Sequence, residues 1–592
     1  MRLPTEDPTA PERSGGHRED GHVSGTSNEG APRRRTVFGI DLGTTYSCIS
    51  RVDDYGRPEV LRNADGADTT PSVVLFDGAD EVVVGIQAKR QARIHPEAVA
   101  ALVKRQMGDG EWRFRVHGVE LSAPAIASQV LRSLAADAAR TTGEQVRDVV
   151  ITVPAYFGDE ERKATKLAGD LAGLHVVDIV NEPTAAAFSY GFGLAAGEAG
   201  SSGQAPQTVL VYDLGGGTFD TTVIRVGGGR IDVVATAGDH ELGGADWDDR
   251  LAGHLAAAFT ASCPEAGDPL DDSYGAQDVL SEAEAAKQSL SQREAVDVLV
   301  VFGGERASVT ITRAELEELT ATLLERTLDL TRSVLAAAAA KGVDGIDTVL
   351  LVGGMAKMPV VARRLTEELG VVPVLADPDL AVAKGAALYG QKMALEAYAT
   401  SSLVAGGALA DGQSLDCATP AARAQAIART AAEYGLATEA VATLVGTEVA
   451  TVTSRGFGLL ALHDASQEIQ SVFLAHQNDP LPIEVEQTFY TVDDDQDHVR
   501  VRVVEQATAA ESLREHDNKV VVEGLITGIP SGYPRGTPVH VTFAMHRDQT
   551  IEVIARHHAV GEPLVLRVEA GVSSESMRFA EATKVARLVQ RV

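Results

Sequence analysis

The sequence predicts an α/β domain followed by an all-β domain. In the first part of the chain, apolar strand-like runs such as VVLF at 73–76 and TVLLVGG at 348–354 alternate with Ala-rich helical stretches, an order typical of α/β architecture. From 454 to about 570, short β-rich runs are instead separated by Asp, Asn, Gly and Pro turns, which indicates a β-sandwich. A third observation, an internal repeat, divides the first domain into two related halves.

Composition narrows the classes of function. The 592 residues include 52 Lys and Arg against 84 Asp and Glu, for a net charge of −32. Such a surface repels nucleic acid and anionic lipid, so we expect neither as a partner. The three cysteines, Cys48, Cys263 and Cys417, lie far apart, a pattern that suits a reducing compartment. No apolar run approaches the ~18–20 residues of a membrane span and no signal-peptide core is present, so we expect a cytoplasmic protein.

Changes in composition along the chain suggest five segments. The N-terminal one is rich in Gly, Pro, Ser, Glu and Arg with few large apolar side chains, which predicts disorder. The expected segments are a disordered tail at 1–35, an α/β domain at 36–396, an Ala-rich helical insertion at 397–451, a β-sandwich at 452–570 and a short helix at 571–592.

The internal repeat joins TVFGIDLGTTYSCISRV at 36–52 to TVLVYDLGGGTFDTTVIRV at 208–226. Each copy is an apolar strand, an Asp-Leu-Gly, a turn rich in Gly and Thr, and a second β-branched strand. Two hairpins built alike but far apart in sequence predict two related half-domains that face a shared cleft.

The chemistry of these turns points to phosphate. Glycines let the backbone approach closely and aim successive N–H groups at phosphate oxygens, and Thr44, Thr45 and Thr218 add hydroxyl donors. Asp41 and Asp213, at the strand ends, would repel phosphate unless a hard cation lay between them. Mg²⁺, which binds oxygen ligands and retains waters, fits that position.

These runs resemble the two phosphate loops of the actin, sugar-kinase and heat-shock-chaperone ATPase superfamily. Within it, the chain resembles the 70-kilodalton heat-shock chaperones over 36–396, and more loosely over 452–570. The runs that carry the resemblance are GIDLGTTYS, AKRQA (88–92), VITVPAYF (150–157), NEPTAAA (181–187), DLGGGTFD (213–220) and LVGGMAKMP (351–359). The resemblance implies an actin-like ATPase fold, with two duplicated lobes around a nucleotide cleft, followed by a peptide-binding β-sandwich.

The resemblance also implies roles for individual residues. Lys89, within AKRQA, would place its ammonium near the γ-phosphate and the attacking water, which fits phosphoryl transfer by positioning and charge neutralisation. Asp41 and Asp213 would hold Mg²⁺ through water, Glu182 would sense the nucleotide, and Pro154 and Arg162 would relay the nucleotide state to the second domain. The expected catalytic residues are Lys89, Asp213, Thr218 and Glu182. The expected phosphate-binding residues are Gly43, Thr44, Thr45, Tyr46, Gly215, Gly216, Gly217 and Thr218.

The adenosine side is expected to combine one helical face with two later turns. Glu284, Lys287 and Ser291 lie on that face at i, i+3 and i+7, with Gln288 where many relatives place an arginine. Opposite them the resemblance implies Gly353, Gly354, Lys357 and Asp379. The implied cofactors are ATP or ADP with Mg²⁺, and K⁺ is a candidate second cation.

In the sandwich, the resemblance implies an apolar channel for extended, unfolded client peptides. Main-chain hydrogen bonds would supply affinity, as in other strand-like peptide complexes. The residues expected to line the channel are Leu462, Phe489, Val492, Val499 and Val501, which could equally be sandwich core. A J-domain co-chaperone and a nucleotide exchange factor are implied further partners.

Three departures from the family pattern affect the expected mechanism. Residues 397–451 replace the short acidic-leucine linker, with only TLVGTEVATV faintly similar, so coupling between the domains is open. The 571–592 segment is too short for the family's helical lid, which predicts fast peptide release. The stretch between Lys104 and Ser122 is abbreviated, which predicts a smaller first lobe.

The leading hypothesis is therefore a slow ATPase of the chaperone type. A regulatory relative with weak turnover and one fixed protein partner is the main alternative, favoured by the altered linker. A small-molecule kinase and a filament-forming scaffold of the same superfamily remain further alternatives, but neither has a use for the sandwich.

Overall fold

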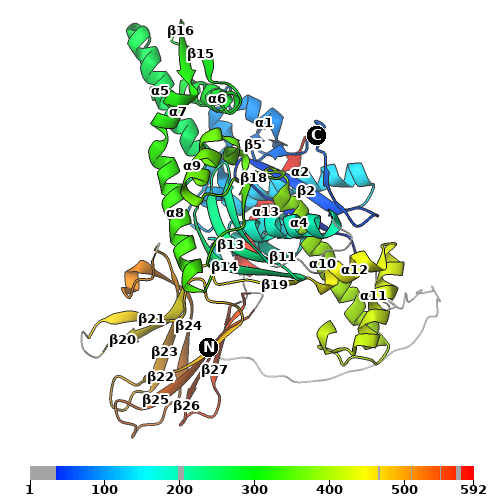
Figure 1. Ribbon diagram of the computed structural model, residues 1–592. Coiled ribbons are helices and arrows are strands. Elements are labelled where there is room, and N and C mark those ends of the chain that lie inside the picture. The colour runs from blue at the N-terminus through cyan, green and yellow to red at the C-terminus, as the bar shows by residue number, and fades with distance from the viewer. Residues whose placement is uncertain are drawn as a thin grey trace, which may run out of the picture.

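The structure is a computed structural model that describes residues 35–197, 206–463, 467–508, 510–546, 549–568 and 575–591. Two α/β lobes form the upper part of the molecule in Figure 1, a strand-rich unit lies below them, and a group of helices lies to the right. The tail expected to be disordered, residues 1–35, lies outside the described residues except for Arg35.

The first lobe is built on a sheet in the order β11-β10-β1-β2-β3. Strands β1, β2 and β3 are antiparallel neighbours, whereas β10 and β11 run parallel to β1. The apolar run of β1 is buried, as expected for a central strand covered on both faces. The strands are β1 (Val37–Asp41), β2 (Tyr46–Val52), β3 (Pro58–Leu61), β10 (Asp148–Val153) and β11 (His175–Asn181), with β4 (Thr70–Pro71) paired to β2.

The second lobe repeats this plan strand for strand. Its sheet runs β18-β17-β12-β13-β14, again with three antiparallel strands followed by two parallel ones, and β19 adds a further parallel strand beside β14. The strands are β12 (Gln207–Leu214), β13 (Phe219–Gly227), β14 (Arg230–Asp239), β17 (Thr348–Val352), β18 (Val374–Leu375) and β19 (Glu448–Ala450). The equal topology is the structural counterpart of the sequence repeat.

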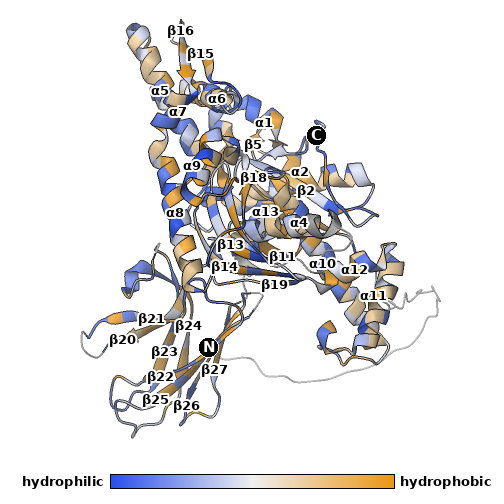
Figure 2. Cartoon of the chain, in the orientation of Figure 1, coloured by the Kyte–Doolittle hydropathy of each residue, from blue (hydrophilic) through white to orange (hydrophobic). Residues whose placement is uncertain are grey.

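Helices cover the sheets, and Figure 2 shows polar and apolar residues on most of them. Local signals explain their ends: α2 begins at Ser122, whose hydroxyl accepts from the Ala125 N–H, and stops at Gly143 with φ of 73°. Among the described helices, none combines the length and the apolar character that crossing a membrane requires. The helices of the lobes are α1 (Ile86–Gln91), α2 (Ala123–Thr142), α3 (Asp159–Leu171), α4 (Glu182–Gly197), α5 (Gly244–Ser262), α6 (Ser273–Leu290), α7 (Arg313–Leu319), α8 (Ala321–Ala340) and α9 (Pro359–Leu369).

Each lobe also carries a small outer sheet. In the first lobe its order is β28-β6-β5-β7, accompanied by the hairpin β8/β9, and in the second lobe it is the hairpin β15/β16. The strands are β5 (Val74–Phe76), β6 (Glu81–Val84), β7 (Val99–Ala100), β8 (Phe114–Val116), β9 (Val119–Leu121), β15 (Ala295–Phe302), β16 (Glu305–Thr312) and β28 (Val589–Gln590). Strand β28 comes from the C-terminal end of the chain and had no counterpart among the sequence predictions.

The segment expected to be an insertion is a helical layer that packs on the lobes. Helix α10 (Ala381–Ala405) runs unbroken through the boundary expected at 396, and α11 (Pro420–Tyr434) and α12 (Thr438–Gly446) follow it. Leu403, Tyr434 and Leu444 are buried in one apolar core with Val209 and Leu350 of the central sheet. This layer is thus part of the core of the α/β domain, and β19 leads from it toward the sandwich.

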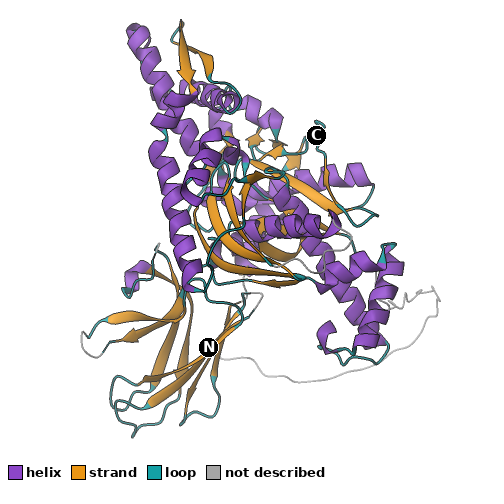
Figure 3. Cartoon of the chain, viewed as in Figure 1, coloured by secondary structure: helices purple, strands orange, loops and turns teal. Residues whose placement is uncertain are grey.

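The strand-rich unit is a sandwich of two four-stranded sheets, β21-β20-β23-β24 and β22-β25-β26-β27. Figure 3 shows it as strands without long helices. Phe457, Val503, Phe543 and Val553 from both sheets share one buried core, as expected for aligned sheets packed face to face. The strands are β20 (Phe457–Leu462), β21 (Ile469–Ala475), β22 (Ile483–Tyr490), β23 (His498–Gln506), β24 (Asn518–Thr527), β25 (Pro538–Met545), β26 (Ile551–His557) and β27 (Leu564–Val568).

Candidate nucleotide site

The two repeated turns connect equivalent strands of the two lobes. The first joins β1 to β2 after Asp41, and the second joins β12 to β13 after Leu214. A Cβ added at Gly43 would lie 2.0 Å from the Tyr46 carbonyl oxygen, so this turn requires glycine. In the second turn the Gly215 N–H donates to the Thr218 carbonyl at 3.1 Å. Both turns therefore expose backbone where a phosphate could approach.

These turns touch each other across the cleft. A Cβ added at Gly216 would lie 2.0 Å from Thr45 Oγ1, and one at Gly217 would lie 2.3 Å from Thr44 Cγ2. The hydroxyl oxygen of Thr44 is buried and has no hydrogen-bond partner, so it is available to a bound group. Two half-domains thus meet at their phosphate loops, as the repeat predicts.

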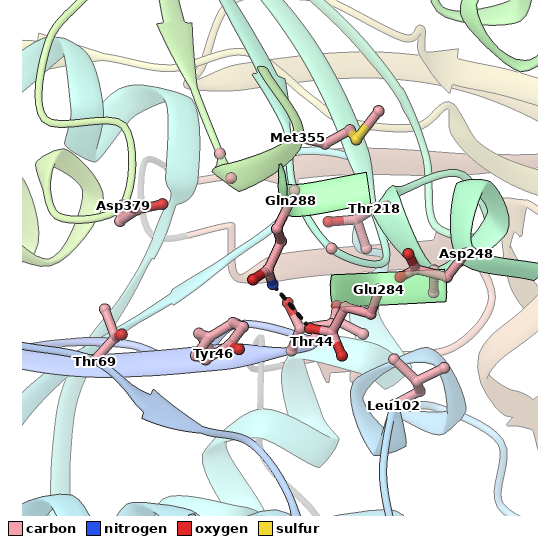
Figure 4. Close-up of a pocket in the computed structure, with 18 of the residues that line it drawn as sticks. Thr44, Tyr46, Thr69, Leu102, Thr218, Asp248, Glu284, Gln288, Met355 and Asp379 are labelled. Atoms are coloured by element: carbon pink, nitrogen blue, oxygen red, sulfur yellow. Dashed lines mark hydrogen bonds between the residues drawn. The ribbon is translucent and has the colours of Figure 1, made fainter. Parts of the chain in front are cut away.

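A cavity of about 580 Å³ opens above the two turns. Figure 4 shows side chains from both lobes around it, among them Thr44 and Tyr46 from the first and Thr218, Glu284 and Gln288 from the second. Gly217 is the one predicted nucleotide, catalytic or metal residue outside its lining. The predicted residues that line it are Asp41, Gly43, Thr44, Thr45, Tyr46, Lys89, Glu182, Asp213, Gly215, Gly216, Thr218, Glu284, Lys287, Ser291, Gly353, Gly354, Lys357 and Asp379.

Carboxylates cluster in and next to the cavity lining: Asp41, Glu182 and Asp213 line the cavity, and Asp220 lies outside the lining. Burial, reinforced by the nearby Glu182 carboxylate, raises the pKa of Asp41 to about 7 and the pKa of Asp220 to about 8. The same two causes raise the pKa of Asp213 well above its ordinary value. Like charges in a desolvated site oppose one another, so this cluster attracts cations.

The described residues fit Mg²⁺ held through water rather than in a protein cage. Among them, no three His, Cys, Asp or Glu side chains are grouped closely enough to enclose an ion. Mg²⁺ commonly retains several waters and binds one or two carboxylates plus phosphate oxygens. Asp41 and Asp213, both at the lining of the cavity, are the residues that would hold such a hydrated ion.

A lysine that the sequence analysis did not select also lines the cavity. Lys104 is 7% exposed, and its Nζ lies 2.6 Å from Glu182 Oε1 and 5.8 Å from the ring centroid of Phe157. Its positive charge acts to lower the pKa of Asp41, Asp213 and Asp220, but burial and Glu182 outweigh it. A possible signal was present in the sequence, because the triplet Lys-Arg-Gln occurs at 89–91 and again at 104–106.

Lys89 lies instead at the opening between the lobes. Its Nζ donates to Glu284 Oε1 at 2.6 Å and to the Tyr46 hydroxyl at 3.1 Å, so it links α1 of the first lobe to α6 of the second. Burial acts to lower the pKa of Lys89, but Glu284 and Tyr46 outweigh it and the pKa is raised. Arg93 makes a parallel bridge to Asp278 at 2.8 Å and also pairs with Glu282.

Arg105, next to Lys104, crosses the cleft at its floor. Its Nε donates to the Gly217 carbonyl at 2.9 Å, and its Nη2 lies 2.6 Å from Asp246 Oδ2. Asp246 in turn accepts from the Gly243 N–H at 2.7 Å at the start of α5. The second phosphate loop is therefore held from both sides.

On the adenosine side, the predicted lysines are already paired. Lys287 Nζ donates to Asp248 Oδ2 at 2.7 Å and to the Gly244 carbonyl at 2.6 Å, while Lys357 pairs with Asp379. Burial raises the pKa of Asp248 to about 6, although Lys287 opposes this. Gln288 Nε2 donates to Glu284 Oε1 at 3.2 Å, the bond drawn in Figure 4.

Behind the floor, the structure connects the cleft to the sandwich. Arg162 donates to Asn181, the neighbour of Glu182, and to the Phe157 carbonyl. Burial lowers the pKa of Arg162 to about 10. It lies on α3, whose N-terminus faces the sandwich, and Pro154 precedes the loop that leads to this helix.

The sandwich caps that helix. The α3 N-cap, Gly158, has no side chain, and Glu505 Oε1 from β23 accepts from the Asp159 N–H at 3.2 Å. Arg455 lies against Glu505, with its Cζ 5.0 Å from the Tyr156 ring and its Nη2 3.3 Å from Glu161. Burial raises the pKa of Glu505 to about 7.

The five predicted peptide residues differ in burial. Val501 is 6% exposed and belongs to the sandwich core, against which Phe489 and Val499 are packed. Leu462 is half-buried at the end of β20, and Val492 is 38% exposed just after β22. Three of the five residues thus fit the alternative interpretation, that they belong to the sandwich core.

A cleft between two topologically equal lobes, with paired Gly/Thr loops and buried carboxylates, defines a two-lobed nucleotide-binding protein with an appended β-sandwich. A family model described as Hsp70 protein matches residues 37–114 and 108–394. The chain therefore belongs to the Hsp70 family, which confirms the resemblance, the actin-like lobes and the C-terminal sandwich as the fold class. As a member it is a chaperone-like ATP-binding protein, and the family consists of ATPases that bind unfolded client peptides.

Proposed function

We propose that this chain binds ATP with Mg²⁺ between its lobes, hydrolyses it slowly, and binds extended segments of unfolded proteins in its sandwich. The observation that supports the hydrolytic part is the buried Lys104–Glu182 pair, which lines the same cavity as Asp41, Asp213 and the two phosphate loops. A cation fixed by a buried carboxylate is pre-organised for charge that develops on a phosphoryl group. A cytoplasmic location is part of this proposal.

Each part of the site has a task in this proposal. The loop amides and the hydroxyls of Thr44, Thr45 and Thr218 bind the phosphates. Lys104, rather than Lys89, faces the γ-phosphate and the attacking water, and Glu182 keeps its ammonium in place. Mg²⁺, when bound, supplies neutralisation of the phosphate charge. Lys89 and Glu284 hold the cleft closed over the nucleotide.

The test compares two lysines with the same substitution. Lys104→Gln retains a donor for Glu182 and is expected to lower the single-turnover hydrolysis rate by ~100-fold or more, because transition-state charge loses its cation. Lys89→Gln is the matched control and is expected to keep the hydrolysis rate within about threefold while nucleotide leaves faster. Full turnover in Lys104→Gln, with loss in Lys89→Gln, would return the catalytic role to Lys89.

The peptide part of the proposal is tested by fluorescence anisotropy of a labelled extended peptide, with and without ATP. Val492→Asp is expected to weaken peptide binding without changing the melting temperature, because Val492 is exposed. Val499→Ala serves as the core comparison and is expected to lower the melting temperature. Unchanged peptide affinity in Val492→Asp would remove this residue from the channel. A J-domain protein and an exchange factor are proposed partners, to be added to the same assay.

A further inference from the structure

The end of the chain returns to the first lobe. We define the C-terminal segment as residues 575–591, which contain α13 (Glu575–Val585) and β28. Helix α13 packs against α2 and α3, and β28 pairs in parallel with β6. Figure 1 shows the C-terminus beside β5 and α2, on the opposite side of the molecule from the sandwich that precedes it in sequence.

Apolar residues of the C-terminal segment belong to the core of the first lobe. Val585 is 1% exposed and Leu588 is 6% exposed, and both are buried in the same cluster as Phe76, Leu121 and Leu134. Side chains buried to this degree contribute to stability like any other core residue. The core of the first lobe therefore includes residues from the C-terminal segment.

Polar contacts fix the position of the segment. Ser122, the N-cap of α2, donates its hydroxyl to Glu581 Oε2 at 2.7 Å, and Glu581 is only 6% exposed. Gln590 Nε2 donates to the Gln129 carbonyl at 2.5 Å. At the surface, Arg591 lies 2.9 Å from Asp77 and Arg578 pairs with Asp170. These contacts span more than 400 positions in sequence and define one orientation.

Main-chain hydrogen bonds complete the docking. The Val589 N–H donates to the Asp80 carbonyl at 2.7 Å, and the Arg591 N–H donates to the Val82 carbonyl at 2.9 Å. The Val589 side chain itself is 62% exposed. Strand addition of this kind covers an edge of the outer sheet that would otherwise present unpaired groups.

The sandwich is consequently attached to both lobes. It follows β19, which pairs with β14 of the second lobe, and it is followed by the C-terminal segment, which docks on the first. We infer that the C-terminal segment is a structural part of the first lobe and a second tether of the sandwich, so that a movement between the lobes pulls on the sandwich from both of its ends. The part that concerns nucleotide-driven movement rests on the proposed function, whereas the structural part does not.

The structural part is tested at one backbone hydrogen bond. Val589→Pro removes the N–H that donates to Asp80, and Val589→Ala, which trims an exposed side chain, is the matched control. In the proline variant we expect amide exchange in 586–591 to rise by ~tenfold or more and the melting temperature to fall by several degrees. The alanine variant should resemble the parent. Equal exchange and melting in the two variants would overturn the docking.

The tether is tested by cutting it. A specific protease site is placed between 569 and 574, and the purified full-length protein is cleaved under native conditions. We expect native mass spectrometry to show the cleaved C-terminal segment still bound, with the melting temperature retained. ATP-induced changes in amide exchange across β20 and β23 should shrink by at least half relative to uncleaved protein.

The outcomes separate the two parts and the proposed function. Release of the cleaved segment without a loss of stability would overturn its role as part of the lobe. An undiminished ATP response after cleavage, or no response in the intact chain, would overturn the tether. Failure of hydrolysis alone would overturn only the proposed turnover, because the exchange experiment needs ATP binding and not its cleavage.

Discussion

The two lobes share one strand order but are completed differently. In each, an antiparallel three-stranded unit is followed by two parallel strands, and the phosphate loop lies in the first hairpin. The second lobe gains a strand on its central sheet, β19, whereas the first gains one on its small outer sheet, β28. The shared part makes the cleft, and the added strands flank the sandwich in sequence, β19 before it and β28 after it. The two lobes therefore share the strands that form the cleft and differ in the added strands that flank the sandwich in sequence.

The largest effect is expected from a substitution at the point where the phosphate loops of the two lobes touch. Gly217→Ala places a Cβ 2.3 Å from Thr44 Cγ2, whereas Gly215→Ala meets its nearest atom, the Thr218 carbonyl oxygen, at 3.5 Å. Overpacking costs about 1–3 kcal/mol, so we expect Gly217→Ala to weaken ATP binding by roughly 5- to 150-fold. Titration calorimetry should find a clearly smaller loss for Gly215→Ala. Equal losses would mean that the loops do not meet as described.

The second prediction concerns pH and the contact of the first lobe with the sandwich. Burial raises the pKa of Glu505 to about 7, against 4.5 for a free glutamate. Between these two pKa values, Glu505 is protonated when the sandwich is docked on α3 and ionised when it is not. Docking is therefore strengthened as pH falls below the docked pKa and weakened as pH rises through it. Between pH 8 and pH 6 we expect a strengthening of about 1.4 kcal/mol, or tenfold.

Glu505→Gln isolates this effect. The amide keeps an oxygen for the Asp159 N–H but does not titrate, so its docking should lose the pH dependence that wild type shows over the same range. Amide exchange at the start of α3 reports docking in both proteins. Arg455, Glu161 and Asp159 face Glu505 and are unchanged in the comparison. A wild type as insensitive to pH as the variant would contradict the prediction.

The third prediction concerns β19, the strand added to the central sheet of the second lobe. Glu448→Pro removes the N–H that donates to the Gly229 carbonyl at 2.9 Å, and we expect β19 to lose about 1 kcal/mol of pairing, or about fivefold in local opening. Glu448→Gln is the control, since it loses only an exposed pairing with Arg230 at 3.2 Å, which contributes little. Amide exchange over 449–451 measures both. Identical protection in the two variants would show that β19 is not held by this bond.

The smallest effect is expected at the cleft opening. Arg93→Ala removes bridges to Asp278 and Glu282, but its side chain is 39% exposed, so the loss should be about 0.5 kcal/mol. Release of a fluorescent ATP analogue is expected to accelerate about twofold and to do so less at high salt. Acceleration beyond tenfold would assign this bridge a larger part in closing the lobes.

Much of the fold could be predicted from the sequence alone. The alternation of apolar strands with helices predicted the α/β lobes, the change of pattern after 454 predicted the sandwich, and the repeat predicted two loops facing one cleft. The cavity lining contains the residues expected around phosphate and adenosine, apart from Gly217. These features were accessible because each depends on a short run whose periodicity or turn chemistry is local.

Three features could not be predicted from the sequence. The choice between Lys89 and Lys104 depends on which of them reaches Glu182, a residue 78 positions from Lys104. The capping of α3 by Glu505 joins residues 346 apart, and β28 pairs with a strand some five hundred positions earlier. The peptide residues were divided between core and surface for the same reason, since a β-rich pattern does not say which face another sheet covers.

The sequence by itself determined that two Gly/Thr loops with strand-end aspartates would bind a phosphate-bearing ligand, because glycine backbone freedom and hydroxyl placement are properties of short segments. Tertiary structure alone decided which lysine pairs with Glu182 and which distant segment completes the core of the first lobe. Both depend on burial and strand pairing between distant segments, and such energies are set by what packs together in space rather than by neighbours in sequence.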